Sequence, residues 1–469
     1  MTIDTLPDDV LLEIFAHYVL EGPGAYIQVD DTELWITLAH VCRKWRNIVF
    51  ESPRRLSLRI RCTARTRVTV MSNVWPDLPI VIRDHYPNRR AGLPFLGPKG
   101  ADNIIAALEL KDRVHQISLS EYPSTLLESI VAAMLGSFPA LTGLRITSRD
   151  DMIPITEFPE AFLGGSAPRL RSCLLVGIPF PGIRKLLLST NQLVELTLRE
   201  IPPSGYISPE AMVTCLSAMP NLKTFCLGFH RYKSIPDQLN HWQHSPPLTP
   251  AVLPSLTEFK FYGPSEYIED LLSRIDAPLL YIVSIRLSYF PTFDTPQLHN
   301  FLARTQILES CSGADVTFYG EGVYFRLGRQ LDLRILGVTL PRRLPSLARI
   351  FGWSFPPIYT LKLLYISLGK YSSLHFQGVE NIQWLEFFRP LTALETLRLD
   401  KNFAPLIVPA LRHSQLAAEG ATQLFPALQV LFIEGPSYPL QDAIDEFVTA
   451  RELSGLPVAV YSQDGNDNS

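Results

Sequence analysis

From about residue 112 onward, apolar residues recur in the order apolar-x-x-apolar-x-apolar, and stretches with a helical period separate these motifs. The last two apolar positions of the motif are two residues apart, so their side chains share one face of a short strand. The residue between them points to the opposite face. Ten motifs of this kind begin at Val114, Leu141, Leu170, Leu193, Leu222, Leu256, Leu280, Ile358, Leu394 and Leu428.

Helical stretches lie between these predicted strands. Residues 123–135, 209–219, 265–275 and 295–305 carry apolar residues at a period near 3.6, and several begin after Pro, Ser or Thr. Up to Leu280 the motifs start about 23 to 34 residues apart, which is close to the leucine-rich-repeat range. The pattern predicts an α/β solenoid of degenerate leucine-rich repeats, with a curved parallel sheet and outer helices. A non-repeat α/β domain with leucine-rich strands is the alternative.

The solenoid is expected to span residues 104–460, after a linker and first-strand region at 61–103. Its motif is blurred between residues 286 and 357, where glycines gather, so the number of repeats there stays open. An amphipathic helix at 440–455 is predicted to cap the open end of the stack. The polar tail at 461–469 is expected to be disordered.

Residues 1–60 have a helical period instead. Leu11, Ile14, Phe15 and Tyr18 form one apolar stripe of a helix that starts near Pro7. A second helix is predicted from about residue 33 to residue 50, before Pro53, and the stretch between the helices is expected to be a surface loop. A plain helical hairpin is the simplest interpretation. The apolar face of the second helix comprises Leu38, Val41, Cys42, Trp45, Ile48 and Val49.

Two separated signatures in this head resemble the F-box motif, which opens with Leu-Pro, acidic residues and an apolar run, and closes with Val-Cys-basic-x-Trp-basic. The stretch between them is longer than in the usual module. The segment after the head, SPRRLSLRI, is similar to the expanded F-box families of mushroom-forming fungi. The residues that carry the F-box resemblance are Leu6, Pro7, Val10, Leu11, Ile14, Phe15, Val41, Cys42, Arg43, Trp45 and Arg46.

The resemblance implies a substrate-recognition adaptor of a cullin-based, SCF-type ubiquitin ligase, which binds the Skp adaptor and, through it, the cullin scaffold. A hairpin shorter than about 60 residues has little core of its own, so part of its apolar surface is expected to meet a partner. The residues assigned to adaptor binding are Leu6, Pro7, Val10, Leu11, Ile14, Phe15, Val41, Cys42, Arg43 and Trp45.

Composition and charge indicate a globular protein and argue against some functional classes. The chain is 46% hydrophobic and 19% charged, which is a globular balance, and its net charge of −4 does not favour nucleic acid. No apolar run reaches the length of a membrane span, and the N-terminus does not resemble a signal peptide. The six cysteines show no regular spacing, so a reduced cytoplasmic or nuclear location is expected. The basic run from Arg54 to Arg67 fits a solvated strand face, a contact with an acidic adaptor, or a nucleic-acid contact.

The neighbouring residues do not support the candidate catalytic and metal sites in the sequence. Residues 92–100 imitate a phosphate-binding loop, but a proline precedes Lys99 and no Ser or Thr follows it. His241 and His244 have zinc-like spacing without further ligands nearby. No catalytic motif is present, so a non-enzymatic protein without metal or cofactor is expected.

The residues beside the inward apolar positions are predicted to line one concave face and to bind an unknown protein substrate. Both signs of charge occur in this row, which fits a protein surface better than nucleic acid. Solvated strand residues without a partner are an alternative for each position, and a scaffold or small-molecule receptor without a ubiquitin role remains open for the chain. The row comprises Arg145, Glu195, Arg199, Glu258, Lys260, Tyr262, Arg286, Lys362, Arg398, Asp400 and Glu434.

Overall fold

The computed structural model forms two compact units, Met1–Leu193 and Val194–Ser469. Residues 64–77 and 86–97 of the predicted linker region, the pair His241 and His244, and residues 464–469 of the predicted tail lie outside the described residues. The structure describes residues 6–20, 34–53, 55–56, 58–63, 78–85, 98–122, 124–148, 158–179, 182–230, 250–288, 295–305, 312–320, 322–336, 360–369, 381–416, 424–435 and 440–463.

The described part of the head contains three helices, α1 (Asp8–Leu20), α2 (Leu34–Val41) and α3 (Arg43–Glu51). The prediction of one helix from 33 to 50 is therefore wrong at Cys42. This residue is extended, with φ −155° and ψ 171°, and its Sγ accepts a hydrogen bond from the Trp45 amide at 3.4 Å. A side chain that accepts from the third residue of a helix is an N-cap, so Cys42 ends α2 and starts α3.

The remainder of the first unit contains five strands that pair in chain order, all of them parallel. The fourth positions of successive motifs, Ile117, Leu144 and Cys173, are paired in register and buried, as predicted. The elements are β1 (Ile60–Cys62), β2 (Ile80–His85), α5 (Pro98–Leu108), η3 (Lys111–Arg113), β3 (Val114–Tyr122), α6 (Ser124–Ala132), β4 (Gly143–Ser148), η4 (Phe162–Gly165), β5 (Ser172–Val176) and α7 (Ile183–Leu188).

In the second unit, eleven described strands pair in the order β6-β7-β9-β11-β14-β13-β12-β15-β16-β17-β18. Phe225 and Phe259 are paired in register, and their rings stack with centroids 5.6 Å apart within the buried layer. The strands are β6 (Glu195–Ile201), β7 (Thr224–Phe229), β9 (Glu258–Gly263), β11 (Ile282–Ser288), β12 (Gly313–Tyr319), β13 (Gly322–Leu327), β14 (Leu331–Leu336), β15 (Leu363–Leu368), β16 (Thr396–Leu399), β17 (Val430–Glu434) and β18 (Ala459–Gln463).

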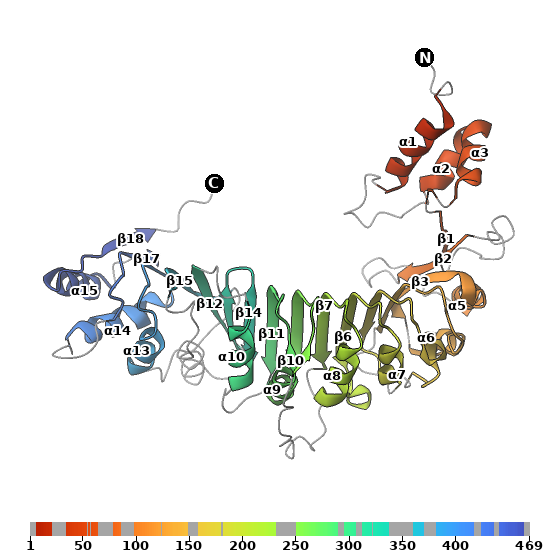
Figure 1. The fold of residues 1–469 in the computed structure, drawn as a ribbon. Coiled ribbons are helices and arrows are strands. Elements are labelled where there is room, and N and C mark those ends of the chain that lie inside the picture. The colour runs from red at the N-terminus through yellow and green to blue at the C-terminus, as the bar shows by residue number, and fades with distance from the viewer. Residues whose placement is uncertain are drawn as a thin grey trace. The chain divides into compact units, whose positions relative to one another are not determined.

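Helices of the second unit follow the strands along the chain, and Figure 1 shows α8, α9 and α10 on one side of the sheet. The short strands β8 (Ala251–Val252) and β10 (Ile275–Asp276) form a separate parallel pair. We call the opposite side of the sheet, whose residues alternate with the buried layer, the outer face. The helices are η5 (Pro203–Gly205), α8 (Pro209–Ser217), α9 (Ser265–Ser273), α10 (Pro296–Ala303), α13 (Asn381–Phe388), α14 (Ala404–Leu416) and α15 (Gln441–Leu453).

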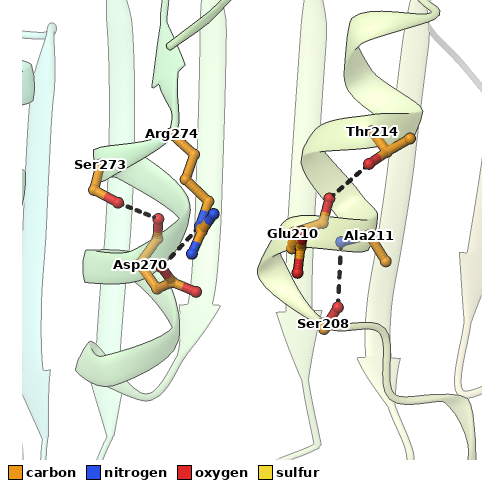
Figure 2. A network of polar contacts seen from close by, with 7 residues as sticks. All are labelled: Ser208, Glu210, Ala211, Thr214, Asp270, Ser273 and Arg274. Atoms are coloured by element: carbon orange, nitrogen blue, oxygen red, sulfur yellow. Dashed lines mark hydrogen bonds and ion pairs between the residues drawn. The ribbon is translucent and has the colours of Figure 1, made fainter. Parts of the chain in front are cut away.

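Polar groups fix the ends of these helices, and in one place they join two of them. Ser208 accepts from the Ala211 amide at the start of α8, and Arg274 donates to Asp270 at 2.8 Å at the end of α9 (Figure 2). The Glu269 carboxylate of α9 accepts from the Gln297 and Leu298 amides in the first turn of α10, at 2.7 and 2.9 Å. Because these amides have no partner within their own helix, Glu269 caps its neighbour and links two repeats.

The blurred stretch between residues 286 and 357 contains an antiparallel insertion. β13 is antiparallel to both β12 and β14, whereas β14 pairs in parallel with β11 and β12 pairs in parallel with β15. Strands joined by short turns pair antiparallel, and Gly328, with φ +56°, lies in one of these turns. The α/β solenoid is confirmed, but its sheet is mixed at this point.

One predicted repeat has the wrong frame. Leu361 and Leu363 were expected to point inward, but Leu363 is 42% exposed and Leu364 is fully buried. Leu364 pairs with Leu397, so the repeat is Leu361-x-x-Leu364-x-Ile366. Three leucines within four residues permit two frames, and only strand pairing distinguishes them. Lys362 therefore lies before the strand, where it forms an ion pair with Glu395.

The C-terminal helix α15 is followed by another strand rather than by the end of the stack. β18 pairs in parallel with β17 and extends to Gln463, so it includes the first residues of the predicted tail. The side chain of Arg451 is fully buried at the end of α15. It donates hydrogen bonds to the carbonyl oxygens of Leu424, Phe425, Leu428 and Leu456 at 3.0 to 3.4 Å.

Candidate functional site

The head divides the predicted apolar stripe of α1 into two. Leu11 and Phe15 are fully buried, and the Phe15 ring packs against the half-buried Trp45 ring at 4.7 Å. Val10 and Ile14 directly precede Leu11 and Phe15 in the sequence, and they are 43% and 42% exposed. Residues four apart lie on the same face of a helix, so α1 has one stripe that forms the core of the head and another that faces outward.

The outward stripe is exposed in the described part of the head. It consists of Val10, Ile14 and Tyr18 on α1, and Val41 at the end of α2 is 56% exposed. Tyr18 was absent from the predicted adaptor-binding set, although its spacing from Ile14 could have indicated it. Of that set, Pro7 and Arg43 are also exposed, and Leu6 and Cys42 are half-buried. Adaptor binding by these residues stays a prediction.

Ion pairs hold the start of α1 against the rest of the head. Lys44 donates to the Leu6 carbonyl at 3.0 Å and lies 3.3 Å from the Asp8 carboxylate. Arg55 contacts Glu13 at 3.0 Å and Asp9 at 3.3 Å, and the hydrogen bond to Glu13 is the main reason why the pKa of Arg55 is raised. The acidic residues of the motif thus position the helix instead of forming part of the apolar surface.

On the outer face of the second unit, arginine and tyrosine side chains form a row across neighbouring strands. Gly228, Tyr262, Arg286, Arg334 and Tyr324 occupy consecutive register positions on β7, β9, β11, β14 and β13. Arg199 of β6 reaches the Tyr262 ring, with its guanidinium carbon 5.3 Å from the ring centroid. We call Arg199, Tyr262, Arg286, Arg334 and Tyr324 the arginine–tyrosine row.

Cation–π contacts order this row. The guanidinium carbon of Arg286 lies 5.3 Å from the Tyr262 ring centroid, on the same ring that Arg199 contacts. Arg334 lies 4.5 Å from the Tyr324 centroid. Gly228 makes room for the first contact, because a Cβ atom there would lie 3.1 Å from the Tyr262 ring. The two tyrosines therefore act as supports that hold the guanidinium groups in place.

The row is positively charged. Its five side chains include three arginines and no carboxylate, and Arg286 and Arg334 are register partners on adjacent strands. Strands in a sheet are about 4.8 Å apart, and like charges on directly neighbouring positions are destabilising. Asp332 relieves part of this repulsion through an ion pair with Arg334 at 3.5 Å, and an acidic group above the row would relieve more of it.

Positions bordering the row carry both signs of charge. Lys260 forms an ion pair with Glu258, which is the main reason why the pKa of Lys260 is raised. The Tyr324 hydroxyl donates to Asp332 at 3.0 Å and accepts from Arg326. Together with Asp315 and Glu195, the row and its border contain five positive side chains and four carboxylates. This part of the face is therefore positive, although the chain as a whole has a net charge of −4.

A second group on the outer face, farther along the sheet, neutralises its own charge. The guanidinium carbon of Arg398 lies 5.1 Å from the Tyr365 ring centroid and 4.9 Å from that of Phe432. Arg398 also donates to the Glu434 carboxylate, which accepts from the Tyr365 hydroxyl at 3.1 Å. Burial and Glu434 raise the pKa of Tyr365 to about 12. We call Tyr365, Arg398, Phe432 and Glu434 the Arg398 cluster.

The predicted substrate residues thus divide into groups. Arg199, Tyr262 and Arg286 belong to the row, while Arg398 and Glu434 neutralise each other. Arg145 and Glu195 are exposed outer-face residues of β4 and β6. The Asp400 carboxylate accepts from the Asn402 and Leu368 amides, so it serves a turn. The prediction missed Tyr324, Arg326 and Arg334, whose strands show a strict alternation of apolar and polar residues that could have indicated them.

Two of the described cysteines, Cys173 and Cys226, have thiols whose pKa is raised, so neither thiol is an activated nucleophile. Burial raises the pKa of Cys173 to about 12 and that of Cys226 to about 11. In the part of the chain that the structure describes, no group of three or more His, Cys, Asp or Glu side chains is placed to hold a metal ion. Across the same residues, no helix combines the length and apolar character needed to cross a membrane.

Comparisons with known proteins agree with the architecture of the head. Residues 3–59 match the family model described as F-box-like. No curated protein matches the sequence significantly. Among solved structures, the chain is similar to the leucine-rich repeat-containing protein LegL7 from Legionella pneumophila, with 15% identity, 74% of this chain and 94% of that chain covered, and a TM-score of 0.27. That likeness is too low to carry an argument, so the solenoid rests on the strand register. The protein therefore combines an F-box-like head with a leucine-rich-repeat-like sheet.

Proposed function

We propose that the protein is a substrate-recognition adaptor of an SCF-type ubiquitin ligase, in which the head binds the Skp adaptor and the sheet recruits a protein target. The match of residues 3–59 to the F-box-like model carries this proposal. F-box domains generally bind a Skp adaptor, which connects them to a cullin. The exposed stripe of Val10, Ile14 and Tyr18 supports it, since exposed apolar patches mark partner surfaces.

The target surface is proposed to be the arginine–tyrosine row. Its chemistry suits an extended protein segment rich in Asp and Glu, because carboxylates pair with guanidinium groups and the row holds three of these. Aromatic and arginine side chains are also the residue types that contribute most at protein interfaces. The ligase, not this chain, would supply the chemistry of ubiquitin transfer.

The test of the head uses charge on its outward stripe. Val10→Asp with Ile14→Asp places two carboxylates on an apolar interface, so we expect capture of the Skp adaptor to fall at least about a hundredfold. Both residues are exposed, so the helical circular dichroism of the full chain should be unchanged.

A matched control adds the same charge elsewhere on the head. Thr37→Asp with Asn47→Asp alters exposed polar residues of α2 and α3 and should leave capture intact. Equal capture by the wild type and the Val10/Ile14 variant, with both folded, would refute adaptor docking through this stripe.

A further inference from the structure

A hollow of about 420 Å³ lies at the amino-terminal edge of the strands in the first unit. Backbone hydrogen bonds fix its floor, because the Thr142 amide donates to the His115 carbonyl and the Arg171 amide donates to the Thr142 carbonyl, both at 2.8 Å. The starts of β3, β4 and β5 are thereby held side by side. The hollow is lined by Arg59, His115, Thr142, Arg169, Arg171 and Gln192.

The described lining of the hollow concentrates positive charge without a carboxylate to balance it. Three of its six lining residues are arginines, and none is a carboxylate. Among the residues that the structure describes, the side chains of Arg59, Arg169 and Arg171 form no ion pair and no hydrogen bond. Three like charges around one hollow repel one another. The hollow is locally positive although the chain as a whole has a net charge of −4. This arrangement favours an anion in the hollow.

The number and type of donors indicate which anion. A guanidinium group pairs with two oxygens of a phosphate or carboxylate through parallel hydrogen bonds. A phosphate monoester has three terminal oxygens, and three arginines line the hollow together with Gln192. A carboxylate has only two oxygens and would leave part of this set unused. We propose that the hollow binds the phosphate group of a phosphomonoester.

The neighbouring histidine is held in a fixed orientation. The Nδ1 atom of His115 lies 3.0 Å from the Arg113 carbonyl oxygen, and because a carbonyl only accepts, Nδ1 carries the proton in this bond. The Thr142 hydroxyl donates to the His115 carbonyl at 3.0 Å, so the wall is rigid where these two residues meet. Arg171 and Thr142 lie two residues before the inward Cys173 and Leu144, so by strand alternation they belong to the same side of the sheet as these buried residues. The hollow therefore does not belong to the outer face, and the proposal is independent of the proposed function.

The test uses the full chain and a fluorescent peptide that carries one phosphoserine. We expect saturable binding by anisotropy, no binding of the unphosphorylated peptide, and competition by inorganic phosphate at constant ionic strength. Arg169→Gln with Arg171→Gln should weaken binding by at least about tenfold, because it removes two charge-assisted donors. Both arginines are exposed, so the melting temperature should not change.

Arg145→Gln is the matched control, since Arg145 is an exposed arginine of β4 in the same unit and lies on the outer face. It should bind the phosphopeptide like the wild type. Unchanged binding by the Arg169/Arg171 variant, or an equal loss in the Arg145 variant, would overturn the proposal, as would displacement by chloride at the same concentrations as phosphate. Phosphopeptide binding more than about tenfold tighter than that of inorganic phosphate supports a protein-borne phosphate, and equal affinities support a free one.

Discussion

The arginine–tyrosine row and the Arg398 cluster use the same residue types on the same face of the second unit, yet they differ in charge. In both, guanidinium groups lie over aromatic rings at about 4.5 to 5.3 Å. Glu434 forms an ion pair with Arg398, and Asp332 forms one with Arg334, but in the row Arg286 and Arg334 are also adjacent like charges. The comparison shows that residue type alone does not identify a binding surface. We propose that the balance between arginines and carboxylates at neighbouring register positions does.

Charge reversal in the row is expected to have the largest effect. Arg286→Glu with Arg334→Glu should reduce binding of a Glu-rich, 12-residue peptide by at least about a hundredfold, because two attractive contacts become repulsive. Fluorescence anisotropy of the full chain at low salt measures this directly.

The control makes the same change in charge outside the row. Lys223→Glu with Arg304→Glu alters two exposed residues and should lower binding only through net charge, by less than about threefold at physiological salt. If both variants lose binding equally, the peptide senses the charge of the whole chain and the comparison between the two regions fails.

Removing one carboxylate should make the Arg398 cluster resemble the row. Glu434→Gln leaves Arg398 stacked on two rings without its ion pair, so we expect a gain in peptide binding of about two- to fivefold. The cost in stability should be below about 1 kcal/mol, since the pair is partly exposed. The pKa of Tyr365 should fall from about 12, because Glu434 contributes to raising it, and spectrophotometric titration against Tyr365→Phe isolates this group. A Tyr365 pKa that does not move would contradict the described network.

The smallest effect concerns the space beneath Tyr262. Gly228→Ala places a methyl group 3.1 Å from the ring, which must tilt away from Arg199. Peptide binding should weaken about two- to threefold with little change in melting temperature. Cys226→Ala, two residues before Gly228 on β7, is the control and should bind the peptide like the wild type. Equal binding by both would show that the Arg199–Tyr262 contact does not order the row.

Periodicity predicted most of the fold and only part of these surfaces. The motif located the buried layer because a two-residue alternation has a direct structural meaning, as at Leu144 and Phe259. It failed at Lys362, where adjacent leucines permit two frames, and at Cys42, where a side chain caps a helix inside an apolar run.

Side-chain contacts between residues far apart in the sequence could not be predicted from the repeat pattern. Arg398 and Glu434 are 36 positions apart, and the antiparallel insertion that brings Tyr324 beside Arg334 has no repeat signature. Likewise, helical spacing placed Leu11 and Ile14 on one stripe, but the packing of α1 against the other head helices decides which of them is buried. The candidate sites depend on these contacts, which is why the sequence identified residue types better than it identified surfaces.

The central claim is that the head and the row bind different partners, and it is tested most directly by one affinity purification with three versions of the full chain. The wild type should capture both the Skp adaptor and a target with an acidic segment. The Val10→Asp, Ile14→Asp variant should lose the Skp adaptor and keep the target, and the Arg286→Glu, Arg334→Glu variant should do the reverse. Loss of both partners in either folded variant, or of neither, would contradict the account.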